Sequence, residues 1–236
     1  MKLNFEEVLS NNTYPGRGIM IGCSECGKRS VVVYFIMGRS VNSRNRIFER
    51  TDDGIRTAAF DMSKMTDPSL VIYHPVRNLG SRTIVTNGDQ TETIFQHLNL
   101  NSGIHAALQT REFEPDPPNY TPRISGLIEP DGSYSLSILK TVDGDPGQCQ
   151  RNFFEYSATI AGLGHFISTY ETDGDPLPSF KGEPLPVIIS DSCGLEAFAH
   201  EIWNALNDEN KVSLYIRERD LETGEVNDLI INRHKA

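Results

Sequence analysis

The sequence lacks any apolar stretch long enough to cross a membrane as a helix. Such a helix needs about 20 consecutive apolar residues, and the most apolar run, VVVYFIM, covers only residues 31–37. The first ten residues, MKLNFEEVLS, include acidic side chains and no apolar core of the kind that export signals carry. We therefore expect a cytoplasmic protein without a membrane partner.

Cysteine is scarce, with only Cys23, Cys26, Cys149 and Cys193 in 236 residues. This number does not indicate a disulfide framework in a chain of this length. Cys23 and Cys26 form a single C-x-x-C, but a structural zinc would need two further ligands at motif spacing. We interpret this segment as a hairpin turn with small residues rather than as a metal or redox site.

Sequence motifs of several enzyme classes are also missing. There is no H-E-x-x-H, no G-x-S-x-G, no Walker-type GK[ST] and no carboxylate-rich metal motif. The segment GRGIMIG superficially resembles a dinucleotide fingerprint, but it runs into a turn and a strand instead of a helix, so we reject that interpretation. We expect neither a metal nor any other cofactor.

Positive charge is scarce overall, since the formal net charge is -10. This balance argues against a nucleic-acid partner. The charge is unevenly distributed: residues 11–90 hold 11 lysines and arginines against 7 acidic residues, and nine of the 11 are arginine. Arginine is suited to bidentate capture of phosphate or carboxylate, which favours a small anionic ligand.

The length of the chain predicts one domain over residues 1–236. The predicted elements lack regular βαβ alternation, which indicates the mixed α+β class. Helical spacing predicts two helices within residues 89–112, broken near 99–102, with Asp89 or Thr91 capping the first and Ser102 the second. A further amphipathic helix is expected at 193–206. Proline-rich segments predict loops at 113–122 and 172–186. Strands are expected at residues 17–22, 29–38, 69–80, 82–88, 123–128, 133–139, 151–158, 163–171, 212–219 and 226–232.

An unusual cluster of arginine and asparagine, GRSVNSRNR at residues 38–46, follows the apolar run directly. It contains Arg39, Arg44 and Arg46 together with Asn42 and Asn45. Amide groups beside guanidinium groups suit an oxygen-rich ligand better than a simple surface ion pair, although a solvated, salt-bridged loop is the alternative. Each charge-assisted hydrogen bond contributes roughly 1.5–3 kcal/mol, so two or three would supply much of a micromolar affinity of about 8 kcal/mol.

Two other polar segments could contribute to a site. In NYTPRISG, Asn119 and Arg123 lie in a loop that Pro122 restricts, and the preceding Glu114 and Asp116 could act as bases or could simply be solvated.

In TNGDQT, Asn87 and Gly88 stand at a strand-to-helix junction, where backbone N–H groups can meet an anion or merely begin a helix. His74 and His165 could serve as general acid or base because histidine titrates near neutrality, or could be structural.

Four segments taken in order resemble the archaeal-type inosine monophosphate (IMP) cyclohydrolases and their bacterial relatives. They are YPGRGIMIG, YFIMGRSVNSRNR, VIYHPVRNLG with TIVTNGDQTETI, and NYTPRISG, followed more loosely by GHFISTYETDGDPLPSF. The resemblance implies closure of a formylated carboxamide ribonucleotide to IMP, the last step of purine synthesis de novo, with no cofactor. It also implies a four-layer αββα sandwich like that of N-terminal-nucleophile hydrolases. No self-cleavage is expected, because the first predicted strand begins near Arg17, sixteen residues after Met1.

The resemblance also implies roles for individual residues. The implied catalytic group is Arg46, Tyr73, Asn45, Asn119 and Asp116, with Arg46 and Tyr73 polarising the substrate or handling protons.

The implied substrate- and phosphate-binding group is Arg17, Arg39, Asn87, Gly88 and Arg123. Within the arginine-rich segment, we expect Arg39 to face the phosphate, Asn45 and Arg46 to face the base, and Arg44 to be solvated.

Two rival functions stay open at this point. One is an amide hydrolase of the same fold that uses Cys23 or Cys26. The other is a purine-nucleotide-binding module without turnover. The partner expected in each nucleotide-based case is a purine ribonucleotide. The oligomeric state, with a homo-oligomer among the alternatives, and the identity of the general acid and base are left undecided.

Overall fold

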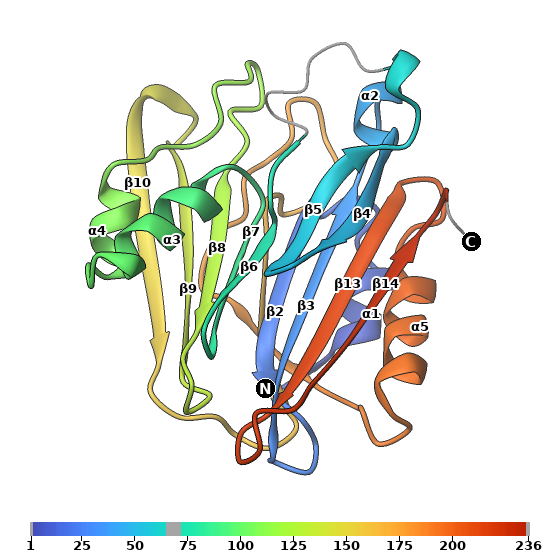
Figure 1. The fold of residues 1–236 in the computed structure, drawn as a ribbon. Helices are drawn as coiled ribbons and strands as arrows, with labels where there is room; N and C mark the ends of the chain where they lie inside the picture. Colours follow the sequence, from blue (N-terminus) through green and yellow to red (C-terminus); the bar gives the residue numbers. More distant parts are fainter. Residues whose placement is uncertain (1, 65–71, 235–236) are drawn as a thin grey trace.

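Two seven-stranded sheets face each other in the computed structural model, which describes residues 2–64 and 72–234 (Figure 1). All neighbouring strands of the first sheet are antiparallel except the β1–β12 pair, which is parallel. The spatial order of this sheet is β1 (Leu3–Asn4), β12 (Leu185–Ile188), β11 (Leu163–Ser168), β2 (Arg17–Cys23), β3 (Arg29–Met37), β13 (Lys211–Asp220) and β14 (Val226–Asn232).

The second sheet is antiparallel throughout and follows the chain order in reverse. Consecutive strands are neighbours, and several pairs are joined by short turns, as at Gly80, whose positive φ of 58° suits a tight turn between β6 and β7. Its spatial order is β10 (Asp145–Tyr156), β9 (Tyr134–Val142), β8 (Arg123–Ile128), β7 (Arg82–Thr86), β6 (Val76–Leu79), β5 (Gly54–Ala59) and β4 (Arg46–Thr51).

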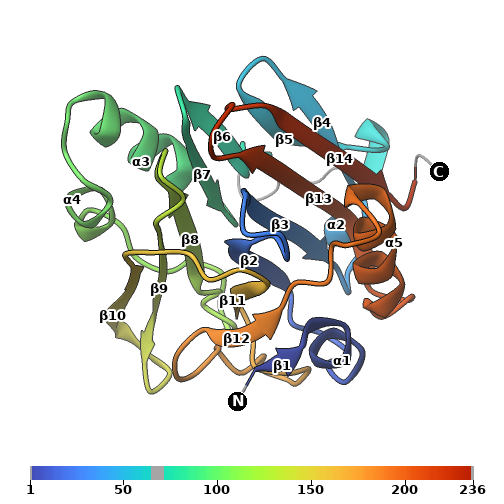
Figure 2. The same cartoon turned by 90° about the horizontal axis from the view of Figure 1, so that it is seen from below.

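The longer helices lie on the outer faces of the two sheets (Figure 2). Helices α1 (Phe5–Ser10) and α5 (Leu195–Ala205) cover the first sheet, and α3 (Gln90–Asn99) and α4 (Ile104–Gln109) cover the second. The four-residue α2 (Val41–Arg44) lies at one end of the molecule, together with a short 3-10 helix at Met62–Lys64 (Figure 1).

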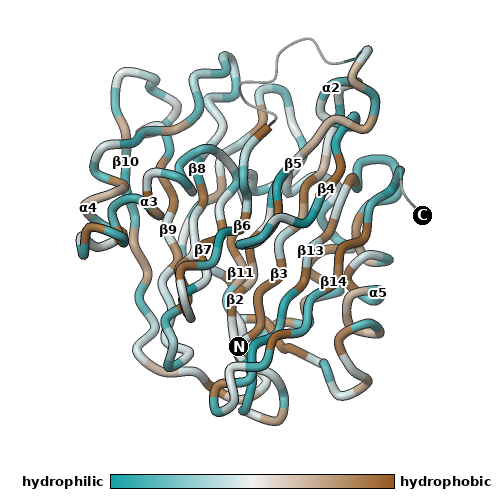
Figure 3. Tube along the Cα trace, in the orientation of Figure 1, coloured by the Kyte–Doolittle hydropathy of each residue, from teal (hydrophilic) through white to brown (hydrophobic). Residues whose placement is uncertain are grey.

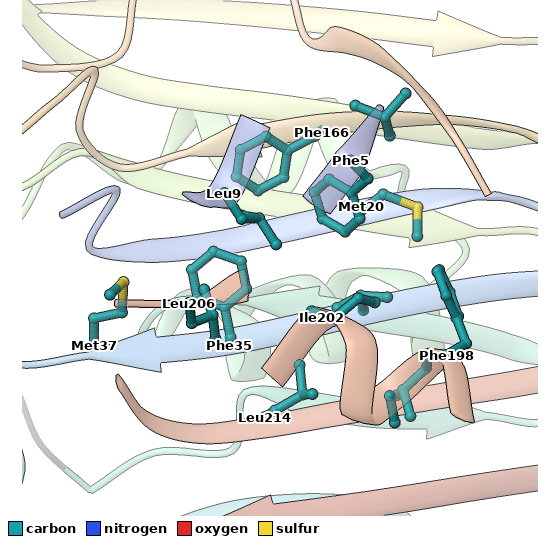
Figure 4. Close-up of a cluster of buried hydrophobic side chains, with 14 of the residues drawn as sticks. Phe5, Leu9, Met20, Phe35, Met37, Phe166, Phe198, Ile202, Leu206 and Leu214 are labelled. Carbon is teal, nitrogen blue, oxygen red and sulfur yellow. The ribbon is translucent and has the colours of Figure 1, made fainter. Parts of the chain in front are cut away.

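The apolar run of β3 explains why the sheets stack with helices outside. Side chains alternate across a strand, so Val33 and Phe35 pack under α1 and α5, while Tyr34 and Ile36 pack against the second sheet. Burial on both faces accounts for the nearly continuous apolar sequence, which Figure 3 shows as brown along β3. Figure 4 shows how side chains from α1 and α5 meet those of β2, β3 and β11.

A separate core forms between the second sheet and its own helices. It contains Ile94 and Leu98 of α3 and Ala107 and Leu108 of α4, packed on strand residues such as Leu139. The residues that recur at helical spacing in the sequence therefore form the buried faces of α3 and α4.

Most of the expected elements are confirmed, including the mixed α+β class, the β2–β3 hairpin and the break between α3 and α4. The expected helix caps are confirmed in part. Asp89 occupies the N-cap position of α3, although its side chain makes no capping hydrogen bond. Asp89 instead forms ion pairs with Arg111 and Arg123. The expected cap of the second helix is wrong, because Gly103 and not Ser102 occupies the N-cap position of α4.

Three segments differ from expectation. The predicted strand at 69–80 begins only at Val76, and its residues 69–71 lie outside the described residues. The predicted loop at 172–186 runs into β12, which pairs with both β11 and β1. The hairpin of β4 and β5 was not predicted.

Within the described residues, 2–64 and 72–234, no helix has the length and apolar character needed to cross a membrane.

Candidate functional site

Several strand ends carry charged side chains toward one end of the molecule, near α2 and the loop before β8 (Figure 1). Arg17 begins β2, Arg46 begins β4 and Arg123 begins β8. Antiparallel pairing brings the start of one strand beside the end of the next, so residues far apart in the sequence meet here. These three arginines belong to the sequence-predicted site residues.

Arg46 is almost completely buried, with 2% of its surface exposed. Its Nε donates to the Ser43 carbonyl (2.8 Å) and its Nη2 to the Met37 carbonyl (3.3 Å). Burial and the nearby positive charge of Arg17 both lower the pKa of Arg46. Arg17 is half-buried, and the repulsion between its guanidinium group and that of the buried Arg46 can be relieved by an anionic or carbonyl-bearing ligand.

Tyr73 lies beside this pair and is buried. Its backbone is fixed by Thr57, whose Oγ1 accepts from the Tyr73 N–H (2.9 Å) and donates to the Tyr73 carbonyl (3.1 Å). The Tyr73 hydroxyl is 2.8 Å from the hydroxyl of Tyr34. Burial and the neighbouring Tyr73 raise the pKa of Tyr34 well above its ordinary value, so Tyr34 stays protonated.

Glu114 supplies a buried carboxylate to the same group of residues. Its Oε2 lies 3.9 Å from Arg17 Nη2. Burial raises the pKa of Glu114 against the opposing effects of Arg17 and Arg123, whereas the pKa of Arg17, although burial lowers it, is raised on balance by Glu114 and Tyr170. The guanidinium keeps its charge at every ordinary pH, so Glu114 is the partner whose protonation state changes.

Arg17 has one polar atom without a partner. Its Nε is buried and forms no hydrogen bond with any described residue. A buried, unsatisfied donor is unfavourable unless a ligand or water binds it. Together with the repulsion between Arg17 and Arg46, this donor indicates a binding site for an oxygen-rich ligand.

Arg123, Asn87 and Gly88 come together at the junction of β7 and α3. Arg123 Nη1 donates to Gln90 Oε1 (2.7 Å) and forms an ion pair with Asp89 (2.7 Å). A Cβ on Gly88 would lie 2.5 Å from Arg123 Nη1, so only glycine leaves room for this guanidinium. Asn87 is fully buried and uses its amide internally, donating to the Pro122 carbonyl (2.8 Å) and accepting from the Ile124 N–H (2.9 Å).

Asp116 organises the loop that carries Glu114. Its carboxylate accepts from the Thr121 N–H (2.6 Å) and the Thr121 hydroxyl (2.5 Å). The same hydroxyl is 2.7 Å from the Tyr170 hydroxyl, and Tyr170 stacks on Tyr14 with ring centroids 5.9 Å apart. Burial is the main cause that raises the pKa of Tyr170 to about 12. Both carboxylate oxygens of Asp116 are therefore used in hydrogen bonds within its own loop.

Asn119 lies farther along the same loop, where its Oδ1 accepts from the Leu177 N–H (3.1 Å). It lines a groove of about 500 Å³ between the two proline-rich loops, which Lys140 and Lys181 also line. Lys140 donates to the Phe180 carbonyl (2.7 Å). Asn119 thus belongs to a neighbouring groove. It is not part of what we call the buried group, which comprises Arg17, Arg46, Tyr73 and Glu114 with the neighbouring Tyr14, Tyr34 and Tyr170.

The arginine-rich segment 38–46 is more ordered than a solvated loop. Arg39 is exposed and pairs with Asp173 (2.6 Å). Asn45 is buried, and its side-chain amide donates from Nδ2 to the Asp61 carbonyl (2.7 Å) and accepts at Oδ1 from the Asp61 N–H (2.8 Å). The expectation that Arg44 is solvated is wrong, because it is half-buried and donates to the Gly38 carbonyl (2.8 Å) and to Asn210 (3.1 Å).

The cysteines and histidines lie outside this group. Cys23 ends β2 and is buried, and Cys26 is exposed in the following turn, at the opposite end of the molecule from α2 (Figure 1). His165 accepts or donates a hydrogen bond at Nδ1 with the Tyr134 hydroxyl (2.6 Å), and burial lowers its pKa. Among the described residues no group of histidine, cysteine, aspartate and glutamate could hold a metal ion.

Three tyrosines of the group were not among the predicted site residues: Tyr14, Tyr34 and Tyr170. Tyr34 carried a usable signal, because a phenol within a buried apolar run needs a hydrogen-bond partner. Glu114 was weighed as a base but not selected, since a carboxylate in a proline-rich loop gives no sign of burial. Chemically, the group combines two cationic donors, a phenolic hydroxyl and a carboxyl whose pKa is raised, which is a set able to polarise a carbonyl and move protons.

Comparison with known proteins supports a family assignment for this arrangement. A sequence model of the family described as IMP cyclohydrolase-like protein matches residues 14–224. The match includes every residue of the buried group.

Archaeal relatives named IMP cyclohydrolase are moderately similar to the chain. The protein of Methanococcus aeolicus is 28% identical over 162 residues, which cover 67% of this chain and 74% of that protein. The protein of Halobacterium salinarum is 28% identical over 131 residues, covering 54% and 63%. That of Methanococcus maripaludis strain C7 is 30% identical over 126 residues, covering 51% and 61%. The last two alignments thus span less than two thirds of the relatives' length.

Proposed function

Because the chain belongs to the IMP cyclohydrolase-like protein family, a family of enzymes, we propose that it closes 5-formamidoimidazole-4-carboxamide ribonucleotide to inosine monophosphate. This reaction is the last step of purine biosynthesis de novo. The observation that carries the proposal is the pair of Arg17, which is half-buried, and Arg46, which is buried, with the buried carboxylate of Glu114 near both and Tyr73 beside them. Its excess positive charge suits a phosphorylated substrate rich in carbonyl groups.

The proposed reaction joins two groups of one molecule. The carboxamide nitrogen attacks the formyl carbon, which becomes tetrahedral, and negative charge develops on the formyl oxygen. That oxygen then leaves as water with one proton from the carboxamide nitrogen and one from the formamide nitrogen. No electrons change hands, so the chemistry requires neither a redox cofactor nor an energy-rich nucleotide. The enzyme has to fix the reactive rotamer, stabilise charge and move protons.

Each of these tasks has a candidate in the buried group. We assign Tyr73 as the proton donor to the formyl oxygen, and Arg46 with the unpartnered Nε of Arg17 as the donors that stabilise the oxyanion. Glu114 is the base that takes the proton of the carboxamide nitrogen. A carboxyl whose pKa is raised is better matched to proton transfer near neutrality than an ordinary glutamate is.

The remaining predicted residues fit binding or support. Arg123 and Arg39 are assigned to the phosphate end of the ribonucleotide, where Arg39 would exchange Asp173 for phosphate. Gly88 leaves space for Arg123.

Three residues whose amide or carboxylate groups bond to the protein itself hold loops in place for the substrate. They are Asn45, Asn87 and Asp116. We keep Asn119 as a substrate contact at the neighbouring groove.

We further propose that the two packed sheets with outer helices represent the four-layer αββα sandwich of the N-terminal-nucleophile hydrolases. The packing of α1 and α5 on one sheet, and of α3 and α4 on the other, supports this proposal. The shared architecture would place chemistry at one open end of the sandwich, where the buried charged group lies.

The rival amide hydrolase is disfavoured by the position of its nucleophile. Arg17 and Cys23 stand at opposite ends of the seven-residue β2, a separation of about 20 Å at 3.3 Å per residue. A thiol there cannot act on a substrate held by Arg17 and Arg46. Replacement of both Cys23 and Cys26 by alanine is therefore expected to leave ring closure unchanged.

A direct test is to incubate the purified protein with the formylated ribonucleotide and follow formation of inosine monophosphate by ultraviolet absorbance. Ring closure well above the uncatalysed rate is expected. Its absence, combined with calorimetric binding of inosine monophosphate, would instead support the non-catalytic nucleotide-binding module. Absence of both turnover and binding would reject both nucleotide-based functions.

A further inference from the structure

The hydroxyl of Tyr34 has a single hydrogen-bond partner among the described residues, the hydroxyl of Tyr73 at 2.8 Å. Tyr34 is completely buried within β3, and its ring stacks on Phe48 with centroids 5.6 Å apart. Packing alone does not explain a tyrosine at position 34, because an apolar residue would fill the same space without a buried hydroxyl that needs a hydrogen-bond partner.

The direction of this hydrogen bond follows from the surroundings of Tyr34. In a pair of hydroxyls one donates and the other accepts. The charged groups that act on Tyr34 most strongly are Arg17 and Arg46, and a guanidinium accepts no hydrogen bond. Among the described residues, the Tyr73 oxygen is therefore the one acceptor within hydrogen-bond distance of the Tyr34 hydroxyl. The reverse arrangement would leave the Tyr34 proton buried without an acceptor.

We propose that Tyr34 is a positioning residue, which donates its hydroxyl proton to the oxygen of Tyr73 and thereby turns the Tyr73 proton toward the substrate. This inference rests on the proposed function for its catalytic consequence. Tyr73, with its oxygen already occupied as an acceptor on one side, presents its own proton to the formyl oxygen. When Tyr73 gives up that proton, the hydrogen bond from Tyr34 and the charges of Arg17 and Arg46 stabilise the phenolate that forms.

The chain offers a matched control on the neighbouring strand. Tyr215 of β13 stands directly opposite Tyr34 in the β3–β13 register and is equally buried. Its hydroxyl donates to Asp228 Oδ2 (3.0 Å), away from Tyr73. The substitutions Tyr34→Phe and Tyr215→Phe remove the same atom from the same kind of environment, and only the first removes the donor to Tyr73.

The first measurement is steady-state ring closure. Tyr34→Phe is expected to lower kcat by about tenfold to a hundredfold, with KM changed less than threefold. The loss does not exceed the lower end of the range for complete removal of a general acid, about a hundredfold, because Tyr73 itself remains. Tyr215→Phe should leave kcat unchanged. Equal losses in both variants, or an unchanged Tyr34→Phe enzyme, would overturn the proposal.

The second measurement needs no turnover. Tyrosine labelled with carbon-13 on the ring carbon bonded to oxygen reports the hydrogen bond at the Tyr73 oxygen through its NMR chemical shift, with Tyr73→Phe identifying the signal. The Tyr73 signal should move in Tyr34→Phe and should not move in Tyr215→Phe. An unmoved signal in Tyr34→Phe contradicts the positioning role even if the wild type closes the ring. A moved signal in a protein without ring closure removes the proposed function but retains the hydrogen bond.

Discussion

Single residues of the buried group face a conflict between burial and charge. Arg46 is nearly inaccessible and near Arg17, and burial together with that neighbour lowers its pKa. Glu114 is equally buried and is the carboxylate that both guanidinium groups face. Burying ionised groups is costly unless their partners satisfy them, so this arrangement is poor for stability. The two guanidinium groups instead suit the binding of a negatively charged group.

The charge of Arg46 is predicted to matter more for ring closure than for folding. Arg46→Met keeps a long side chain but removes the donors, so turnover should fall at least a hundredfold, or about 2.7 kcal/mol, as for loss of one oxyanion donor. The melting temperature should stay close to that of the wild type, because relief of repulsion with Arg17 offsets the lost hydrogen bonds. The control is Arg56→Met, at an exposed ion pair with Glu49, which should leave turnover unchanged. Near-normal turnover in a folded Arg46→Met protein would exclude Arg46 from the mechanism.

Glu114 is predicted to make stability depend on pH with an unusual sign. Because burial raises its pKa above the ordinary 4.5, the native state holds more protons than the unfolded state between 4.5 and the native pKa. The free energy of unfolding therefore falls as pH rises through that window. Relative to Glu114→Gln, which cannot ionise, the wild type should be comparable in stability below pH 4.5 and progressively less stable above it.

Urea unfolding of both proteins at a series of pH values measures this difference. The same Glu114→Gln substitution should abolish most ring closure, because it removes the base. A wild type that gains stability over the variant as pH rises would contradict the assigned direction of the pKa shift.

At the scale of elements, short and locally irregular segments place the site residues. Helix α2 is only four residues long, and a capping box holds it, in which Ser40 and Ser43 bond to each other's backbone. Arg44 ties the segment to Gly38 and Asn210. Helices of this length are not stable alone, so these contacts set the position from which β4 begins and Arg46 points inward.

Strand β2, which carries Arg17, depends on close contact with β11. A Cβ on Gly22 would lie 2.3 Å from the Leu163 carbonyl oxygen and 2.4 Å from the Gly164 Cα, both backbone atoms. Gly22→Ala should therefore push the strands apart and lower the free energy of unfolding by about 1–3 kcal/mol, as overpacking does.

Gly147→Ala is the control for this substitution, since its Cβ would meet only the flexible Asp145 side chain, at 3.3 Å. It should change stability by no more than about 0.5 kcal/mol. Chemical denaturation compares the two variants, and equal stability of both would show that β2 and β11 can separate without cost.

At the scale of the whole molecule, the two sheets are joined along one side by side-chain hydrogen bonds between β4 and β14. Asn232 accepts from the Phe48 N–H (2.8 Å) and donates to the Phe48 carbonyl (3.0 Å), although the two residues are 184 positions apart. Arg50 and Asp228 form an ion pair along the same seam. Residues of β14 thus hold β4, the strand that begins with Arg46, in position.

Loss of this connection should destabilise the entire fold. Asn232→Ala removes the side-chain partners of the buried N–H and carbonyl of Phe48. It should lower the free energy of unfolding by roughly 2–6 kcal/mol, given about 1–3 kcal/mol for each unsatisfied group. Asn227→Ala, on an exposed position of the same strand, should change it little. Urea titration followed by circular dichroism tests this, and a small effect of Asn232→Ala would show that packing alone joins the sheets.

The sequence by itself determined the elements that depend on neighbouring residues. The apolar run before Gly38 predicted a strand buried on both faces, and the spacing of Ile94, Leu98 and Leu108 predicted two helices with one buried side. These predictions succeed because hydrophobic periodicity acts over a few residues. The composition of residues 38–46 was likewise recognisable as unusual, whereas the roles of Arg46 and Arg123 were implied by the resemblance to a known family.

The tertiary structure alone decided which residues meet. The two-residue β1 exists because Leu3 and Asn4 pair with Val187 and Ile188 across almost the entire chain. Likewise, Glu114 became a buried carboxylate only because its loop folds against Arg17, and Arg44 became a structural residue only because Asn210 lies beside it. Burial, and with it the pKa of a carboxyl or the direction of a phenol's hydrogen bond, depends on the groups packed around a side chain. Those groups come from distant parts of the sequence, which no local pattern records.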